Sequence, residues 1–231
     1  MSDQAEVMAL SLEAPLQAWG VSSRFQRRTT LPYPTRSAIA GMFCAAAGAA
    51  KGGELEKRLL QEIFPKIRIA VIVLPAKARA RASRLRLLED YHTVLGTRRA
   101  SGKENADPVV TRRHYLLDSR FGVLMEGPRD SLEMLAQYIQ DPVWGIWFGR
   151  KCCLPSAPVF RGIHPDREEA LRSLGCTGGT KGMTVVEEAE RFKDGTDTLP
   201  DWPLAFGRPD SSCEGRAFGP RRVRVIPAGS E

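Results

Sequence analysis

The spacing of apolar residues predicts regular structure over most of the first two thirds of the chain. Apolar and polar residues alternate over residues 7–13 and 67–74, which predicts two strands. Between them, apolar residues recur at intervals of three and four, which predicts a helix over residues 35–50. The apolar stripe of that helix consists of Ile39, Met42, Phe43 and Ala46.

The same reasoning gives the remaining elements. Further helices are expected at residues 54–64, 128–140 and 166–174. Further strands are expected at residues 112–118, 121–126, 144–148 and 221–226. Loops are expected at residues 14–20, where Pro15 and Gly20 interrupt the pattern, and over 177–215, which we expect to be irregular because Gly and Pro are frequent.

Residues 76–118 predict a long β-hairpin arm inserted between two strands of the domain. In its first half Arg84 and Arg86 alternate with leucines, as in a strand with one basic face. The order strand–helix–strand, arm, strand–helix–strand is a split βαβ arrangement. We therefore expect an α+β fold of the ferredoxin-like (RRM) type over residues 1–162, followed by a mostly irregular C-terminal extension over 163–231.

Positive charge is concentrated on the predicted arm. The chain has 34 Lys and Arg against 27 Asp and Glu, a formal charge of +7. Residues 75–120 contain eleven basic and five acidic side chains, so this segment carries +6 of the excess. Such a field favours polyanionic partners, because it attracts phosphates and releases their counterions. Tyr91, His92, His114 and Tyr115 are interleaved and could stack on unpaired bases; the alternative is a solvated charged hairpin.

Two further places could bind RNA. Thr35, Arg36 and Ser37 begin a predicted helix, where free backbone N–H groups and the helix dipole favour an anion; ordinary helix capping is the alternative. Trp19 beside Gly20 could stack on a base, unless the Trp is part of the core. Arg150 and Lys151 follow a predicted strand and could hold phosphate.

Several function classes lack support. The five cysteines are odd in number and include no CxxC pair, so we expect neither a metal site nor a cofactor. No apolar run reaches the ~20 residues that span a bilayer, and the first residues do not resemble a secretory signal. A cytoplasmic protein without membrane contact is expected.

Catalysis remains an alternative. No HExxH or GxSxG motif is present, but His114 or His92 with Tyr91 or Tyr115 would suit a metal-independent ribonuclease. A duplex DNA binder is a third reading, although no basic helix face of the recognition type is visible.

Four segments together resemble one family. They read LSLEAPLQAWG at 10–20, YPTRSAIAGMFCAAAG at 33–48, DYHTVLG with RRHYLLD at 90–96 and 112–118, and WFGRKCCLP with PVFRG at 147–155 and 158–162. This combination is similar to the Cas-five (CasD) family of the type I-E CRISPR Cascade complex. The resemblance implies a RAMP fold with a thumb hairpin that binds the 5′ handle of the guide RNA (crRNA). Implied partners are the crRNA, the Cascade backbone subunit and the large subunit, with target DNA contacted only indirectly.

The expected function is thus a non-catalytic Cascade subunit that caps the crRNA 5′ handle in antiviral defence. The alternative is an endoribonuclease of the type I-C kind that processes precursor crRNA through His114, Tyr115 and His92. The predicted RNA-binding residues are Gln17, Trp19, Gly20, Arg24, Arg27, Thr35, Arg36, Ser37, Arg84, Arg86, His92, Thr93, Arg98, Arg112, Arg113, Tyr115, Arg150 and Lys151.

Overall fold

A computed structural model describes residues 5–21, 26–75, 85–98, 101–207 and 217–229. The strands are β1 (Glu6–Gln17), β2 (Arg27–Arg28), β3 (Arg68–Leu74), β4 (Arg86–Val94), β5 (Val109–Gly127), β6 (Phe160–His164), β7 (Val185–Glu188), β8 (Asp197–Ala205) and β9 (Ala217–Ile226). The α-helices are α1 (Arg36–Ala46), α2 (Glu54–Arg58), α3 (Arg129–Gln140) and α4 (Arg167–Ser173). Short π and 3₁₀ turns extend α2 over Leu59–Ile63 and Phe64–Lys66.

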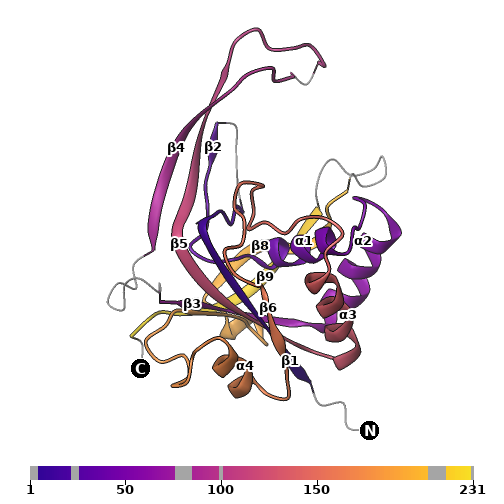
Figure 1. The fold of residues 1–231 in the computed structure, drawn as a ribbon, viewed down its shortest axis with the longest axis vertical. Helices are drawn as coiled ribbons and strands as arrows, with labels where there is room; N and C mark the ends of the chain where they lie inside the picture. Colours follow the sequence, from indigo (N-terminus) through magenta and orange to yellow (C-terminus); the bar gives the residue numbers. More distant parts are fainter. Residues whose placement is uncertain (1–4, 22–25, 76–84, 99–100, 208–216, 230–231) are drawn as a thin grey trace.

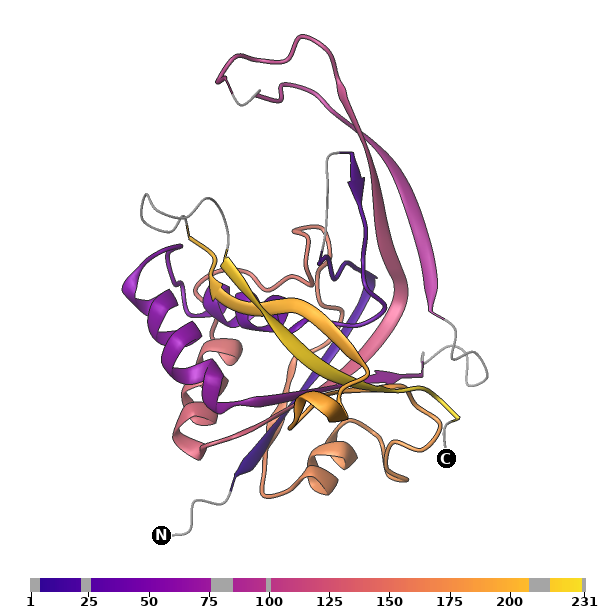
Figure 2. The same cartoon turned by 180° about the vertical axis from the view of Figure 1, so that it is seen from behind.

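One large sheet organises the fold. Its strand order is β6-β1-β5-β3-β7-β9-β8, and these neighbours are antiparallel. The long strand β5 also pairs with β4 and, in parallel, with β2. Figures 1 and 2 show that β4 and the first half of β5 leave the body as a hairpin, with β2 beside its base. We call the described part of this hairpin, residues 86–98 and 101–117, the arm.

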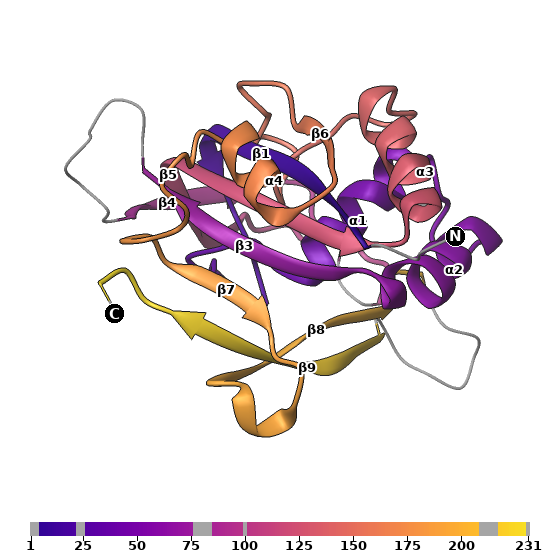
Figure 3. The same cartoon turned by 90° about the horizontal axis from the view of Figure 1, so that it is seen from below.

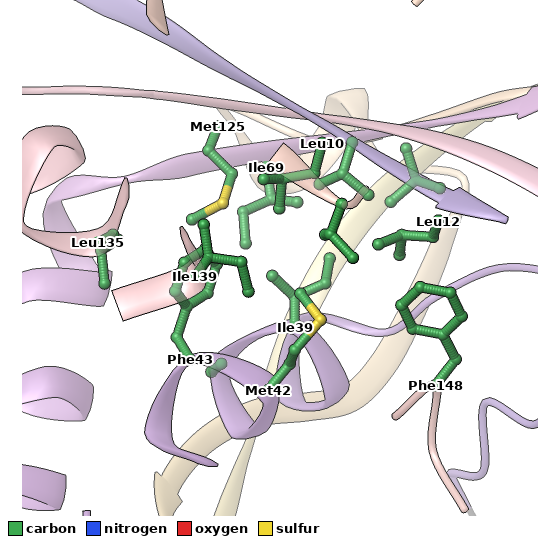
Figure 4. Packing of buried hydrophobic residues seen from close by; sticks show 14 of the residues in the cluster. Leu10, Leu12, Ile39, Met42, Phe43, Ile69, Met125, Leu135, Ile139 and Phe148 are labelled. Atoms are coloured by element: carbon green, nitrogen blue, oxygen red, sulfur yellow. The ribbon is translucent and has the colours of Figure 1, made fainter. Parts of the chain in front are cut away.

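Two hydrophobic clusters occupy the two faces of the sheet. Helices α1 and α3 cover one face, where Leu10, Ile69 and Met125 meet Phe43 and Ile139 in a single core (Figure 4). Helix α4 covers part of the other face (Figure 3). Alternate β1 residues enter alternate clusters, as expected from the two-residue period of a strand. Helix α1 and the base of the arm lie on the same side of the sheet, because residues of both line one groove.

The sequence predicted most elements but not all of their extents. The predicted helix at 35–50 is α1, and β3, α3, α4 and β9 form where expected. Of the arm predicted over 76–118, the described residues pair as a hairpin, and residues 76–84 and 99–100 lie outside the described residues. β1 continues through Pro15 to Gln17 instead of ending in a loop at residue 14. The two strands predicted at 112–118 and 121–126 are one strand, β5, which bends at Asp118 with a φ of 48°.

Two predictions of the sequence were wrong. Residues 144–148 form no strand, because Val143 and Trp144 donate their N–H groups to Ala46 and Ala45 at the end of α1 rather than to a sheet neighbour. Residues 163–231 are not mostly irregular, because the described part contains α4 and the strands β7, β8 and β9, which continue the main sheet. Short strands of mixed composition gave too weak a period to be found.

Candidate nucleic-acid interface

A groove of about 1180 Å³ lies between α1, the base of the arm and the loop that follows α3. We call it the α1–arm groove. Its basic lining residues are Arg28, Lys51, Arg113, Arg150 and Lys151. Its aromatic lining residues are Trp144, Trp147, Phe206 and Phe218. Among the described lining residues the one acid is Glu56, which accepts backbone N–H groups from Gly52, Phe206 and Gly207 with one oxygen, so its charge is partly compensated.

The cations on one wall are placed by strand pairing. In the parallel pair of β2 and β5, Arg27 lies opposite Arg112 and Arg28 opposite Arg113. Successive side chains of a strand point to opposite faces. Arg28 and Arg113 therefore project together into the groove, whereas Arg27 and Arg112 project from the outer face of the arm. Arg113 donates from Nε to the Thr111 hydroxyl at 3.1 Å. This hydrogen bond does not use the Nη1 and Nη2 atoms of the guanidinium, which can donate to other acceptors.

Arg150 holds this wall together. Its Nη1 donates to the carbonyl of His114 at 3.0 Å and its Nη2 to the carbonyl of Arg28 at 2.8 Å. Its guanidinium also lies over the ring of Tyr115, 4.4 Å from the centroid. These contacts join β2, β5 and the 149–153 turn, so Arg150 positions its neighbours in addition to adding charge to the groove.

The two faces of the arm differ. Antiparallel pairing places Arg86 and His92 on the face of Arg113, and Glu89 and Thr93 on the outer face with His114. On the outer face His114 Nε2 and the Glu89 carboxylate are 2.8 Å apart. That hydrogen bond, with the nearby Arg112, holds the pKa of Glu89 below its ordinary value. On the groove face His92 lies 3.4 Å from the carboxylate of Asp90.

Known proteins with similar sequences identify the family of this chain. The family model described as CRISPR-associated protein (Cas_Cas5) matches residues 7–224. The chain belongs to the Cas5 family. A curated relative, the CRISPR system Cascade subunit CasD of Escherichia coli (strain K12), is 30% identical over 178 residues, which cover 74% of this chain and 78% of the relative.

Solved structures are also similar to this Cas5 protein. A chain of a CRISPR RNA-guided surveillance complex matches with a TM-score of 0.72 and 26% identity, covering 96% of this chain and 90% of that one. A second match, titled a crystal structure of a Cas protein, has a TM-score of 0.60 and 27% identity, covering 96% and 98%. The mixed α/β architecture with its large antiparallel sheet is thus shared with known CRISPR-associated structures.

The Cas5 structure contradicts the prediction that Trp19 stacks on RNA. Trp19 is only 2% exposed, and its ring packs on Phe121 and Phe148 at centroid distances of 6.4 and 5.8 Å. Gln17 is also sealed inside, where its side-chain amide donates to the carbonyls of Leu12 and Ser119. The core alternative holds for the Trp, because β1 continues to Gln17 and a bridge to Leu31 then keeps Trp19 within the core cluster.

Arg36 was also predicted to face RNA, and the structure places it in the interior. Its side chain is fully buried, donates to the carbonyls of Ile67 and Phe64, and pairs with Glu188. Its guanidinium lies 4.0 Å from the centroid of the Trp202 ring. Burial lowers the pKa of Arg36, and Glu188 offsets part of that effect. The guanidinium therefore fastens α1 to strands of the C-terminal region.

A second arginine completes this buried cluster. Arg221 donates to both carboxylate oxygens of Asp201, at 2.8 and 2.7 Å, and Asp201 also accepts the backbone N–H of Arg36 at 2.9 Å. Burial opposes the charge of Arg221, but the hydrogen bonds to Asp201 raise its pKa above the ordinary value. The N-terminus of α1 is thus occupied by a carboxylate of this chain, which satisfies a free backbone N–H of the first turn.

The other predicted residues divide between three environments. Thr35 is buried and caps α1 by accepting the N–H of Ala38, and it lines the groove together with Ser37 and Gly20. Tyr115 is buried, and its hydroxyl accepts from the thiol of Cys152 at 3.7 Å, so its ring is not free for a base. On the arm, Arg98 is exposed near the tip. Arg24 and Arg84 lie outside the described residues.

Sequence reasoning missed Trp144 and Trp147 as site residues because it assigned both to a strand. The two rings, three positions apart in a stretch that also holds Pro142 and Gly145, were the available signal for a loop with exposed aromatics. Arg28 was also missed, although its neighbours Arg24 and Arg27 were predicted to bind RNA. Its pairing with β5 could not be seen without the register of the two strands.

Among the described residues, no group of three or more His, Cys, Asp or Glu side chains could hold a metal ion. In the same residues, no helix is long and apolar enough to cross a bilayer. The thiols of Cys44 and Cys153 are buried in the core, and burial raises the pKa of each to about 12.

Proposed function

We propose that this protein is a non-catalytic subunit of a type I-E CRISPR Cascade complex that binds and caps the 5′ handle of the crRNA in the α1–arm groove. The observation that carries the proposal is the convergence of Arg28, Arg113 and Lys151 around one groove of a Cas5-family fold. A curated relative is named as a Cascade subunit, and a similar structure is titled an RNA-guided surveillance complex.

The scaffold in this proposal is a ferredoxin-like RAMP domain. Leaving out β2, α2 and the arm strand β4, the chain order is β1-α1-β3-β5-α3-β6, the βαββαβ plan. These four strands are neighbours in the order β6-β1-β5-β3, with α1 and α3 on one face. In this view the arm is the inserted thumb, and residues 163–231 extend the sheet and fix α1 through Asp201 and Glu188.

The groove suits a single-stranded RNA better than a duplex. Residues of α1 and of the arm line it, and its lining combines cations with aromatic rings. Cations follow the backbone phosphates, while unpaired bases expose the edges by which RNA sequence is recognised. In this account the guide pairs with the invading DNA, so the protein touches target DNA only indirectly.

The proposed partners beyond the crRNA are the Cascade backbone subunit and the large subunit, in the cytoplasm. The arm displays large apolar side chains, with Leu87, Tyr91 and Leu95 each more than half exposed. Apolar side chains gathered on a projecting hairpin are typical of protein contact surfaces. We therefore place a subunit contact on the arm beyond the groove.

The geometry argues against the ribonuclease alternative. His114 and Tyr115 are neighbours on a strand and project to opposite faces, and His92 shares its face with the buried Tyr115. A general acid and a general base must both reach the scissile phosphate. Incubation of the purified chain with precursor crRNA in EDTA tests this reading, and cleavage that His114→Ala abolishes would contradict the non-catalytic proposal.

The binding proposal is tested by the salt dependence of handle affinity. Each phosphate contact contributes about 0.7 to the slope of log K against log salt for a single strand. Arg28→Ala and Arg113→Ala should each weaken binding of a handle RNA and lower that slope. Arg129→Ala is the matched control, since Arg129 is exposed on α3 and paired with Glu6 and Glu133. Equal slopes for all four proteins would refute the groove as the RNA site.

A further inference from the structure

The exposed tryptophan of the groove is the feature that the proposed function leaves unexplained. Trp144 is 45% exposed and Trp147 is half-buried, and both line the α1–arm groove. Trp is large and apolar, so it usually buries most of its surface. The ring predicted to stack on RNA, Trp19, is sealed in the core. The exposed Trp of the groove therefore comes from the loop after α3 and not from the loop after β1.

The loop that carries these rings is held firmly. Val143 and Trp144 donate backbone N–H groups to the last carbonyls of α1, at 2.8 and 3.3 Å. Gly48 lies directly beneath, with a φ of +67°, and a Cβ there would come within 2.7 Å of Val143. At the other end Phe148 donates to the carbonyl of Cys153 at 2.7 Å. A loop whose backbone is fixed before binding loses little conformational entropy when a ligand stacks on its rings.

The charge around the rings identifies the ligand class. Lys151 Nζ lies 6.0 Å from the centroid of the Trp147 ring. Arg28 and Arg113 line the same groove from the arm side, and Lys51 lines it from the end of α1. Aromatic rings beside cations that can follow a phosphate backbone are the usual platform for unpaired bases. A protein partner of ordinary composition would not require this surplus of positive charge.

We propose that Trp144 and Trp147 form a stacking platform for unpaired bases of the bound RNA, with Lys151 at the adjoining phosphate. This inference rests on the proposed function and assigns to the groove its base-stacking residues. Stacking is tolerant of sequence, because every base has a π-face. The platform would thus fix how the strand is splayed, while recognition of base identity falls to polar groups nearby such as Ser37.

A double-mutant comparison with abasic RNA tests the platform. Handle RNAs with one abasic nucleotide at each position in turn keep every phosphate but lack one base. Trp144→Ala and Trp147→Ala should each weaken intact handle RNA on the order of tenfold, with the salt slope unchanged. For each Trp there should be one abasic position at which the Ala variant and the native chain bind the abasic RNA equally tightly. Trp144→Phe, which keeps a ring, should recover most of the affinity.

Controls separate the possible failures. Leu154→Ala removes another exposed apolar side chain that does not line the groove, and should bind RNA normally. Salt-dependent binding by the native chain, with both Trp variants equally tight, would overturn the platform and leave the proposed function standing. Absence of salt-dependent binding by the native chain would refute both. Normal RNA binding with failure to enter the assembled complex would reassign the rings to a protein contact and overturn the proposal.

Discussion

Replacing Arg36 with Met separates a structural arginine from an RNA ligand. Met keeps a similar length of unbranched side chain but removes the charge and the hydrogen bonds. The substitution deprives the carbonyls of Ile67 and Phe64 of a donor and leaves Glu188 with Arg221 at 3.3 Å as its remaining partner. Breaking a buried ion pair by removing one partner costs about 3–5 kcal/mol.

The expected consequence is measurable in a thermal melt. For a chain of this size each kcal/mol corresponds to roughly 2–4 °C, so Arg36→Met should lower the melting temperature by roughly 6–20 °C. Arg224→Ala is the matched control, because Arg224 pairs with Glu187 at 2.9 Å but is half exposed. A surface pair of that kind contributes about 1 kcal/mol or less.

RNA binding by Arg36→Met, measured below its melting range, should keep the native salt slope. A guanidinium bound to protein carbonyls and Glu188 neutralises no phosphate, so no counterion release is lost. A melt within the control's range, together with a slope reduced by about 0.7, would show that Arg36 is a phosphate ligand and that the buried cluster is misassigned.

Three further predictions follow from other parts of the structure. Gly149→Ala should destabilise the fold strongly in a denaturant titration, because φ is +93° and a Cβ would lie 1.7 Å from a backbone oxygen, whereas Gly178→Ala should be nearly neutral. Burial opposes the charge of Glu187, but hydrogen bonds from two arginines lower its pKa below the ordinary carboxyl value. The pairing therefore stabilises the fold fully at a pH above the ordinary carboxyl pKa, and this stabilisation is lost as the pH falls through the lowered pKa of Glu187. Glu187→Gln should therefore flatten the acid side of the stability profile; an unchanged profile would argue against the pairing. Alkylation at pH 8 followed by peptide mass mapping should modify the exposed Cys152 and spare Cys153, whose pKa is about 12.

Local periodicity was sufficient for the scaffold. The apolar stripe at residues 39–46 predicted α1, and the alternation at 67–74 predicted β3, because each pattern is complete within a few residues. The arm was predictable for the same reason. Basic and apolar residues alternate in its first half, which predicts a strand, and a second strand was predicted at residues 112–118. Where a pattern was short or interrupted, as in β7 and β8, no comparable periodicity is present.

The site was less predictable because burial depends on distant residues. Arg36 looks like a phosphate ligand at a helix start until Asp201 and Glu188, 165 and 152 positions away, are seen to surround it. Trp19 looks like a loop aromatic until its ring is found against Phe121 and Phe148, more than 100 positions away. Conversely, Trp144 becomes a groove residue only because its backbone pairs with the end of α1. No local pattern contains these relationships.

Photo-crosslinking of handle RNA to the protein, mapped by peptide mass spectrometry, tests the RNA site most directly. We expect crosslinks in the loop at 143–151 and in β2, which line the α1–arm groove. Helix α4, Arg167–Ser173, covers the other face of the sheet and should give none. Crosslinks confined to α4 and its neighbours would place the RNA on the opposite side of the molecule and contradict the account.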